Sequence, residues 1–417
     1  MRRSRWHVSA LPGQNYTAAM NPNLNRLQLY PFQKLAQLLK GVTPRSDLTP
    51  INLSIGEPKH ATPQFIQKTL AQNLEGLANY PTIQGSPGLR EAIAAWLKRR
   101  FNLQHINSET EVLPVNGSRE ALFAIAQAVI DASLTEPVVV CPNPFYQIYE
   151  GAALLACAVP HFLNILPQNS FMLEFGQLDE SVWRRAQLVY VCSPGNPSGS
   201  VMTINEWEEL FRLADKYGFV IASDECYSEL YFDEHTPALG GLEAAQRLGR
   251  SGYPRLIVFN SLSKRSNVPG MRSGFVAGER TIIEKFHLYR TYHGCAMSPP
   301  VQAASIAAWS DEAHVVENRR MYREKFTKVA PILKNLMPHL EIPQGGFYLW
   351  AGTLIPDTEF AWLLYRDYNV TVLPGSYLAR EAHGINPGFN FARIALVAPL
   401  AECIEAAQRI ADFIEQL

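Results

Sequence analysis

The chain has 417 residues and a formal net charge of −1, and its length exceeds what one hydrophobic core usually supports, which predicts two domains. A charge this close to zero creates no long-range field, which argues against nucleic acid or an anionic membrane as a partner. The six cysteines are scattered without a CxxC pair, which argues against a disulfide framework or a metal site and favours a reducing, cytoplasmic location.

Residues 1–20 are set apart from the rest of the chain. The first nineteen are rich in arginine and lack acids, but they have neither the apolar core of a secretory signal nor an amphipathic period. We predict a disordered leader here and exclude it from the fold. No apolar run approaches the length of a membrane span, so we expect a soluble protein.

After the leader, helical patterns alternate with short apolar runs. The runs have the length and composition of strands buried on both faces, and they cover residues 111–115, 137–142, 186–194, 219–225, 255–261 and 273–278. Helices are predicted over residues 63–74, 89–101, 120–132 and 204–218. This alternation predicts an α/β fold with a mainly parallel sheet covered by helices.

From about Ser310 the chain changes to long charged helices, with a strand over residues 345–350 and a closing helix. We interpret this region as a second, smaller domain. The predicted organisation has an N-terminal segment that contributes to the small domain, a large ligand-binding domain and a small C-terminal domain, over residues 21–55, 56–309 and 310–417.

Polar residues gather directly after three predicted strands, in the sequences SPGNPSG (193–199), SDECY (223–227) and NSLSK (260–264). In open α/β sheets, ligands bind at the carboxyl ends of the strands. Lys264 at such an edge, near Arg272, would have a destabilised ammonium and could form a Schiff base with a carbonyl compound. A single lysine of this kind is more often an exposed loop residue.

Asp224 follows an apolar run, so we expect a buried carboxylate, which needs a cationic or strongly donating partner. The protonated ring nitrogen of a cofactor would supply one, and a structural ion pair with a distant arginine explains Asp224 equally well. Asn196 and Tyr227 could donate to a phenolate oxygen, although Asn196 also suits an ordinary turn.

A predicted helix start provides an anion site. Gly117, Ser118 and Arg119 would present backbone N–H groups and a hydroxyl there, with Ser118 as a plain helix cap the alternative. Ser261 and Arg272 could contact the same anion, and Tyr146 could lie against a planar ring or be an ordinary buried tyrosine. An aldehyde, a ring nitrogen, a phenolate and a phosphate occur together in pyridoxal 5′-phosphate, which we predict as the cofactor.

The sequence resembles the fold-type I pyridoxal-phosphate aminotransferases of class I/II over nearly everything after Met20. The motifs that carry the resemblance are IGEP (55–58), NYPTIQGSPGLREAIA (79–94), NGSREAL (116–122), SPGNPSG, SDECY, SLSKRSNVPGMRSG (261–274) and FARIAL (391–396). The resemblance implies a mostly parallel seven-stranded sheet flanked by helices, a smaller α+β domain and a transaminase that acts as a homodimer.

The resemblance also implies residue roles. Lys264, Asp224 and Tyr227 would be catalytic, and Ser263 would join the cofactor-binding residues. Tyr80 would reach the phosphate in the neighbouring subunit, while Arg393, Gly56 and Asn196 would bind the substrate at its α-carboxylate.

For the substrate, the resemblance is greatest to bacterial N-succinyl-L,L-diaminopimelate aminotransferases of lysine biosynthesis, through residues 27–35 and 289–302. We hypothesise 2-oxoglutarate and glutamate as the second pair. His293 stands where aspartate aminotransferases carry an arginine for the distal carboxylate, which disfavours a short dicarboxylate. Lys59 and Arg290 are alternative partners for that group, on position only.

Other functions use the same motifs. Broad transamination of aromatic or neutral amino acids and a pyridoxal-phosphate β-lyase both stay open, because pocket geometry decides between them. A non-enzymatic, cofactor-binding regulator is disfavoured, because the leader is too short for a helix-turn-helix domain and both Lys264 and Asp224 are present.

Overall fold

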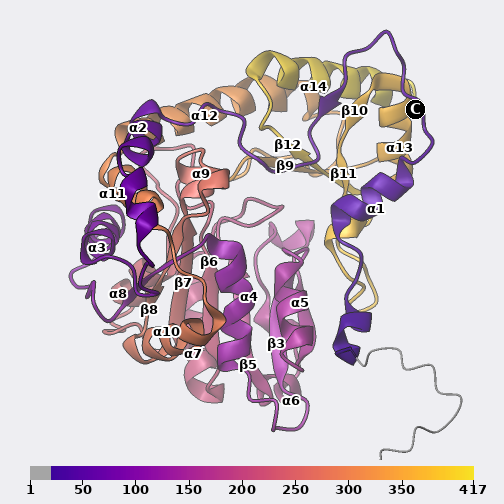
Figure 1. The fold of residues 1–417 in the computed structure, drawn as a ribbon. Helices are drawn as coiled ribbons and strands as arrows, with labels where there is room; N and C mark the ends of the chain where they lie inside the picture. The colour runs from indigo at the N-terminus through magenta and orange to yellow at the C-terminus, as the bar shows by residue number, and fades with distance from the viewer. Residues whose placement is uncertain (1–19) are drawn as a thin grey trace, which may run out of the picture.

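The computed structural model describes residues 20–417 (Figure 1). The predicted leader lies outside the described residues, apart from Met20. The helices are α1 (Pro31–Leu38), α2 (Gln64–Gln72), α3 (Pro87–Phe101), α4 (Ser118–Val129), α5 (Ile148–Leu155), α6 (Glu180–Trp183), α7 (Ile204–Tyr217), α8 (Gly241–Arg247), α9 (Leu262–Arg265), α10 (Arg280–His293), α11 (Pro299–Ser310), α12 (Ala313–Leu333), α13 (Asp357–Tyr368) and α14 (Leu400–Ile414).

The larger sheet has seven strands in the order β2-β8-β7-β6-β5-β3-β4. Their bounds are β2 (Val112–Val115), β3 (Val138–Asn143), β4 (Val159–Asn164), β5 (Ala186–Cys192), β6 (Val220–Asp224), β7 (Leu256–Ser261) and β8 (Gly274–Gly278). Only β8 runs antiparallel to its neighbours, β2 and β7. The prediction of an α/β fold around a mostly parallel seven-stranded sheet is confirmed.

Alternate residues of the central strands enter two different hydrophobic cores. In β7, Leu256 and Val258 pack with α3, α7, α8 and α11, whereas Ile257 and Phe259 pack with α4, α5 and α10. Successive side chains of a strand point to opposite faces, so a strand covered on both sides must be apolar at every position. Figure 1 shows α4 and α5 on one face of the sheet.

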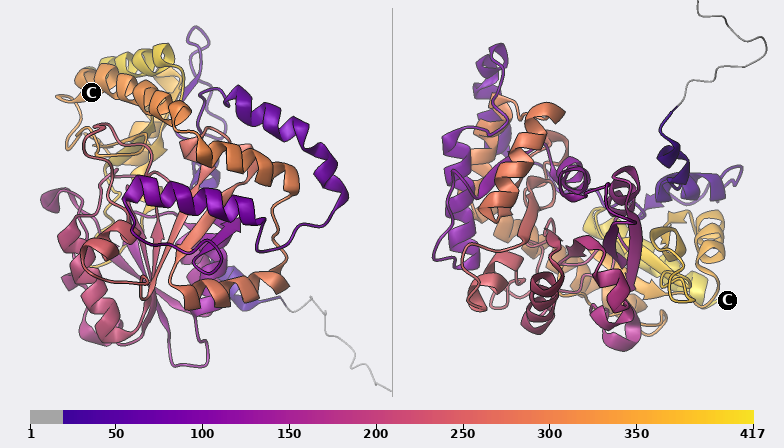
Figure 2. Two further views of the ribbon diagram at one scale, coloured as in Figure 1. Left: turned by 90° about the vertical axis from the view of Figure 1, so that its left-hand side faces the viewer. Right: turned by 90° about the horizontal axis from the view of Figure 1, so that it is seen from below.

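The helix boundaries have local causes. At the start of α7, the Thr203 hydroxyl accepts from the Glu206 N–H at 3.3 Å and the Glu206 carboxylate accepts from the Thr203 N–H at 2.7 Å, a capping box. The helix ends at Gly218, whose φ of +87° suits glycine. Figure 2 shows α2, α3 and α11 grouped at one end of the molecule, where α11 packs against both of the other helices.

A second group of elements lies above the carboxyl ends of the large sheet (Figure 1). It contains the antiparallel sheet β11 (Leu373–Pro374), β12 (Phe391–Ala395) and β9 (Tyr348–Gly352), with α12, α13 and α14. Strand β1 (Ile51–Asn52) pairs with β10 (Val370–Thr371) and so joins the N-terminal segment to this group. The domain boundaries themselves stay a prediction.

Strand β9 begins at Tyr348, three residues later than predicted. Gly346 has a φ of +89°, so the chain turns before the strand starts. Gly345 lies against Pro194 and the Leu230 carbonyl, where an added Cβ would come within 2.7 and 3.0 Å of them. Within residues 20–417, no helix has both the length and the apolarity needed to cross a membrane.

Candidate active site

A cavity of about 550 Å³ opens where β5, β6 and β7 end. Twelve predicted site residues line it: Gly56, Ser118, Arg119, Tyr146, Asn196, Asp224, Tyr227, Ser261, Ser263, Lys264, Arg272 and Arg393. They come from both sheets, from the start of α4 and from the loop after β1. The structure therefore brings together nearly all the residues that the sequence placed at this edge, although their individual roles stay predictions.

Lys264 lies in the one-turn helix α9, directly after β7. Its Nζ donates to the Gly56 carbonyl at 2.6 Å. Burial, together with the nearby guanidinium groups of Arg393 and Arg272, lowers the pKa of Lys264 to about 8. An amine with such a pKa has a far larger unprotonated fraction near neutral pH than an ordinary lysine, and the unprotonated form is the one that acts as a nucleophile or a general base.

Asp224 is the last residue of β6 and is buried. Its Oδ2 accepts from the Tyr149 hydroxyl at 2.7 Å and its Oδ1 from the Cys226 N–H at 3.2 Å. Burial nevertheless raises the pKa of Asp224. In the described chain no Lys, Arg or His nitrogen lies within 4.0 Å of this carboxylate. A buried carboxylate without a cation fits the protonated ring nitrogen of pyridoxal phosphate.

The predicted anion site is built around Gly117, which has a φ of +82° and is the N-cap of α4. The Nη2 atom of Arg272 lies 2.1 Å from where a Cβ of residue 117 would be, so only glycine allows the guanidinium this position. Arg272 donates to the Pro269 carbonyl at 2.8 Å and forms no ion pair within residues 20–417. The alternative interpretation of Ser118 as the cap is wrong, because Gly117 holds that place.

Two serine hydroxyls complete this anion site. Ser261 Oγ lies 2.9 Å from Ser263 Oγ, and both side chains face the cavity beside Arg272. A helix N-terminus, hydroxyl groups and an unpaired guanidinium form a suitable cradle for a phosphate. The residues present therefore fit the phosphate of the predicted cofactor.

Arg393 lies in β12 and is 4% exposed. Its Nη1 donates to the Asn196 Oδ1 at 3.0 Å and its Nη2 to the Ser54 carbonyl at 2.8 Å, while its buried Nε has no partner among residues 20–417. The guanidinium also lies over the Tyr348 ring, 4.4 Å from the centroid. An unsatisfied buried cation on a cavity wall suits a carboxylate ligand.

Gly56 is required by close packing on the same wall. A Cβ at this position would lie 1.8 Å from the Tyr348 hydroxyl oxygen. The Tyr348 hydroxyl in turn lies 3.0 Å from that of Tyr227. Since the Oδ1 of Asn196 is engaged by Arg393, its amide nitrogen is the group that stays available to a ligand.

Tyr146 lines the cavity, and its hydroxyl accepts from the Arg119 Nε at 2.5 Å. Its ring meets that of Tyr149 edge to face, with centroids 5.8 Å apart. The predicted contact between Tyr146 and a planar cofactor ring stays a prediction.

Sequence reasoning missed two tyrosines of the site. Tyr149 donates to Asp224, and Tyr348 contacts Tyr227, Arg393 and Gly56. The partners are 75 and 121 positions apart along the chain, so no local pattern reveals the contacts. The one available signal for Tyr149 is its place three residues after Tyr146, in the same aromatic segment.

Neither candidate partner for a distal carboxylate lines the cavity. Arg290 is fully buried, and its Nη1 donates to both oxygens of Glu120 at 2.6 and 2.7 Å, so its charge is already neutralised. Lys59 lies outside the cavity lining and pairs with Glu57 at 3.1 Å. Tyr80 is fully exposed and does not line the cavity of its own chain.

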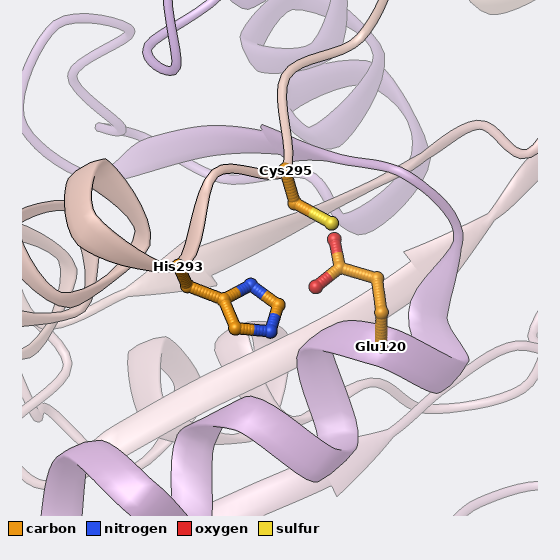
Figure 3. A group of neighbouring side chains, drawn as sticks. All are labelled: Glu120, His293 and Cys295. Atoms are coloured by element: carbon orange, nitrogen blue, oxygen red, sulfur yellow. The ribbon is translucent and has the colours of Figure 1, made fainter.

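His293 also lies away from the cavity lining. Figure 3 shows it pointing toward Glu120 and Cys295, a group whose ligand atoms lie within 4.8 Å of one another. The Glu120 carboxylate is held by Arg290, and the Asn116 N–H donates to it at 2.9 Å. We interpret the group as an ion-paired anchor for the start of α4, because a metal ion would have to displace the arginine.

Comparison with known proteins gives a consistent result. The model of the family described as aminotransferase class I and II matches residues 49–410. An LL-diaminopimelate aminotransferase from Desulforudis audaxviator is 28% identical over 393 residues, 93% of this chain and 96% of the relative. One from Nitratidesulfovibrio vulgaris (strain DP4) is 30% identical over 368 residues, 87% of this chain and 90% of the relative.

Solved structures agree. An aminotransferase from Neisseria meningitidis Z2491 superposes with a TM-score of 0.91 at 50% identity, covering 94% of this chain and all of the other. Aminotransferase AspB from Helicobacter pylori 26695 superposes with a TM-score of 0.87 at 34% identity, covering 94% of this chain and all of the other. Members of the family use pyridoxal phosphate, which the cavity fits. This chain therefore belongs to the aminotransferases of class I and II and is a pyridoxal-phosphate-dependent enzyme.

Proposed function

We propose that this aminotransferase exchanges an amino group between N-succinyl-L,L-diaminopimelate and 2-oxoglutarate, in the biosynthesis of diaminopimelate and lysine. The observation that carries the proposal is a fourth cation on the cavity wall, Arg119, beside Lys264, Arg272 and Arg393. The names of the relatives support a diaminopimelate-type substrate.

Arg119 suits the far end of a long, doubly acidic substrate. Its Nε donates to the Tyr146 hydroxyl, its guanidinium lies 6.0 Å from the Tyr30 ring centroid, and it forms no ion pair within residues 20–417. Two of its nitrogens are thus available to a carboxylate. It replaces Lys59 and Arg290 as the partner that we propose for the distal carboxylate.

The acids on the cavity wall favour the N-succinyl form of the substrate. The lining acids are Asp224 and Glu57, and Glu57 already pairs with Lys59. Unmodified LL-diaminopimelate carries a distal ammonium that needs an anionic partner. N-succinylation turns that ammonium into an amide and adds a carboxylate. Because Asp224 is assigned to the cofactor ring nitrogen, this matches a wall that keeps a free cation and leaves no anion for the substrate.

The proposed roles follow from the contacts in the site. Pyridoxal phosphate supplies an electron sink when bound. Lys264 moves a proton to and from the substrate Cα, Asp224 holds the ring-nitrogen proton, and Arg393 binds the substrate α-carboxylate. Asn196 and Tyr227 donate hydrogen bonds to the cofactor phenolate. The cofactor phosphate is bound by Gly117, Ser118, Ser261, Ser263 and Arg272.

Replacing Arg119 by glutamine tests the substrate assignment. We expect kcat/KM for N-succinyl-L,L-diaminopimelate to fall about 10- to 100-fold, because one charge-assisted hydrogen-bonded contact is lost. The rate with alanine should change less than about twofold. The measurement is the half-reaction of the loaded enzyme with each amino acid in turn, including glutamate and unmodified LL-diaminopimelate, followed by cofactor absorbance.

Lys59→Gln is the matched control, because it removes a cation that is already paired with Glu57. It should change the rates with N-succinyl-L,L-diaminopimelate and with alanine less than about twofold. An equal loss with alanine in Arg119→Gln would show a structural role for Arg119. If the wild-type enzyme preferred unmodified LL-diaminopimelate, that compound would take the place of the N-succinyl form in the substrate assignment. Failure of glutamate to react would exclude 2-oxoglutarate and glutamate as the second pair.

One observation favours a second candidate, transamination of aromatic amino acids. Tyr30, Phe32 and Leu378 add aromatic and aliphatic groups to the cavity lining. An aromatic aminotransferase from Pyrococcus horikoshii OT3 superposes with a TM-score of 0.80 at 26% identity. Faster half-reactions with phenylalanine and tyrosine than with the acidic substrates would select this alternative.

We also propose a homodimer in which Tyr80 contacts the phosphate in the partner subunit. The fully exposed Tyr80 ring follows a short 3₁₀-helix (Leu74–Ala78) with Leu74 and Leu77 exposed, so an apolar strip is available for contact. Sedimentation of the purified enzyme as a monomer at assay concentration would contradict this assembly.

A further inference from the structure

Lys264 is carried by a helix too short to hold it in place. Helix α9 has four residues and is followed by Ser266 at its C-cap. A single turn has few internal hydrogen bonds, so outside contacts must fix its carbonyl groups. The neighbouring long helix α12 supplies those contacts through Asn318, which is 1% exposed.

The Asn318 amide uses all of its hydrogen-bonding capacity at this point. Its Nδ2 donates to the Lys264 carbonyl at 3.2 Å and to the Arg265 carbonyl at 3.5 Å. Its Oδ1 accepts from the Asn267 Nδ2 at 3.1 Å and from the His60 Nδ1 at 2.8 Å. Two donors and two acceptors are thus satisfied, which fixes the orientation of the amide.

The contact with His60 leads back to the substrate side of the cavity. The His60 ring packs against the Tyr322 ring of α12 in a tilted arrangement, with ring centroids 4.4 Å apart. Four residues earlier in the same loop, the Gly56 carbonyl accepts from the Lys264 Nζ. Lys264 therefore contacts this loop in two ways. Its amine donates directly to the Gly56 carbonyl, and its main-chain carbonyl is linked to His60 through Asn318.

We infer that Asn318 is a positioning residue for the aminotransferase reaction: it holds the Lys264 backbone and the Gly56–His60 loop in one arrangement, so that the amine stays aimed at the reacting atoms. The inference rests on the proposed role of Lys264. Displacement of a reacting group by about 1 Å can cost about 10²-fold in rate. Asn318 contributes through geometry and touches neither substrate nor cofactor.

Asn318→Ala is the test variant. We expect kcat to fall about 10- to 100-fold, with KM changed less than about threefold, because Arg393 and Arg119 are untouched. In the cofactor-free enzyme, the pH at which the Lys264 amine becomes reactive should rise by about one unit, because a displaced amine regains water. Peptide mass spectrometry of Lys264 acylated at a series of pH values measures this directly.

The wild-type acylation rate should rise with pH through about 8, since only the unprotonated amine reacts and burial holds the pKa of Lys264 at that value. His60→Phe is a second variant, which keeps a ring packed against Tyr322 and removes the donor to Asn318. It should lower kcat and raise the pH at which the Lys264 amine becomes reactive, each by less than Asn318→Ala does. This variant keeps the test decisive if Asn318→Ala folds poorly.

His314→Ala is the matched control. His314 is on the same helix, and its Nε2 contacts Ser266 Oγ at 2.8 Å without reaching the lysine carbonyl or the loop. It should lower the melting temperature and leave the reactivity of the Lys264 amine unchanged. Unaltered kcat and amine reactivity in folded Asn318→Ala, or equal changes in the control, would overturn the inference. Borohydride reduction of the wild-type enzyme loaded with cofactor should leave the cofactor fixed on the peptide that contains Lys264. Its absence from that peptide would instead refute the role of Lys264.

Discussion

Replacing Lys264 by alanine should abolish turnover, with kcat reduced at least about 10⁴-fold, because the variant loses both the attachment point for the cofactor and the general base. The Gly56 carbonyl, which accepts from this amine at 2.6 Å, loses its partner as well. Multiple-turnover assays check the rate. Absorbance of the gel-filtered protein after incubation with pyridoxal phosphate checks covalent retention of the cofactor.

Lys325→Met is the matched control for this variant. Lys325 is also a buried lysine whose pKa burial lowers to about 8, but it lies outside the cavity and its Nζ contacts the Val397 carbonyl at 3.3 Å. Its replacement removes a buried charge that forms no ion pair in the described part of the chain, so activity should persist. Substantial multiple turnover by Lys264→Ala, or an equal loss in Lys325→Met, would refute the assignment of Lys264.

Replacing Asp224 by asparagine should lower kcat about 10²- to 10³-fold, while the protein stays folded. Asparagine has nearly the same shape and its oxygen can still accept from Tyr149, but it cannot stabilise a proton on the ring nitrogen. Without that proton the ring withdraws electrons poorly. Steady-state rates with glutamate and the pH dependence of the bound-cofactor spectrum measure the effect.

The neighbouring carboxylate provides the control. Glu225 is equally buried, and burial raises its pKa to about 7, but it accepts from the Gly241 N–H at 2.7 Å and the Ser223 hydroxyl at 2.9 Å and does not line the cavity. Glu225→Gln should change stability more than activity. If Asp224→Asn kept nearly full activity, the carboxylate would have a purely structural role.

Several features of the fold were predictable because their causes are local. Apolar runs such as residues 255–261 are long enough only for strands and have no polar face, so a sheet covered on both sides was expected. The polar residues after these runs then had to meet at one edge. Lys264 and Asp224 lie together in the cavity for this reason.

Other features depend on contacts that no local pattern encodes. The antiparallel direction of β8 could not be inferred, since a short apolar run reads the same in either orientation. Arg290 was a candidate for the distal carboxylate on position only, yet Glu120, 170 positions away, neutralises its charge. Arg119 was assigned to an anion through its backbone, whereas its side chain adds a further cation to the cavity wall.

Residue types and spacing were sufficient to identify the cofactor chemistry. The lysine, the carboxylate and the groups that donate hydrogen bonds to a phosphate each follow a strand or start a helix, and these positions can be recognised in the sequence. The pairings within the site came from packing. Tyr149 reaches Asp224, Tyr348 excludes any side chain at position 56, and Asn318 holds Lys264, each across a long stretch of chain. Such contacts depend on the relative placement of separate helices and strands, which burial of the whole core sets and no short segment specifies.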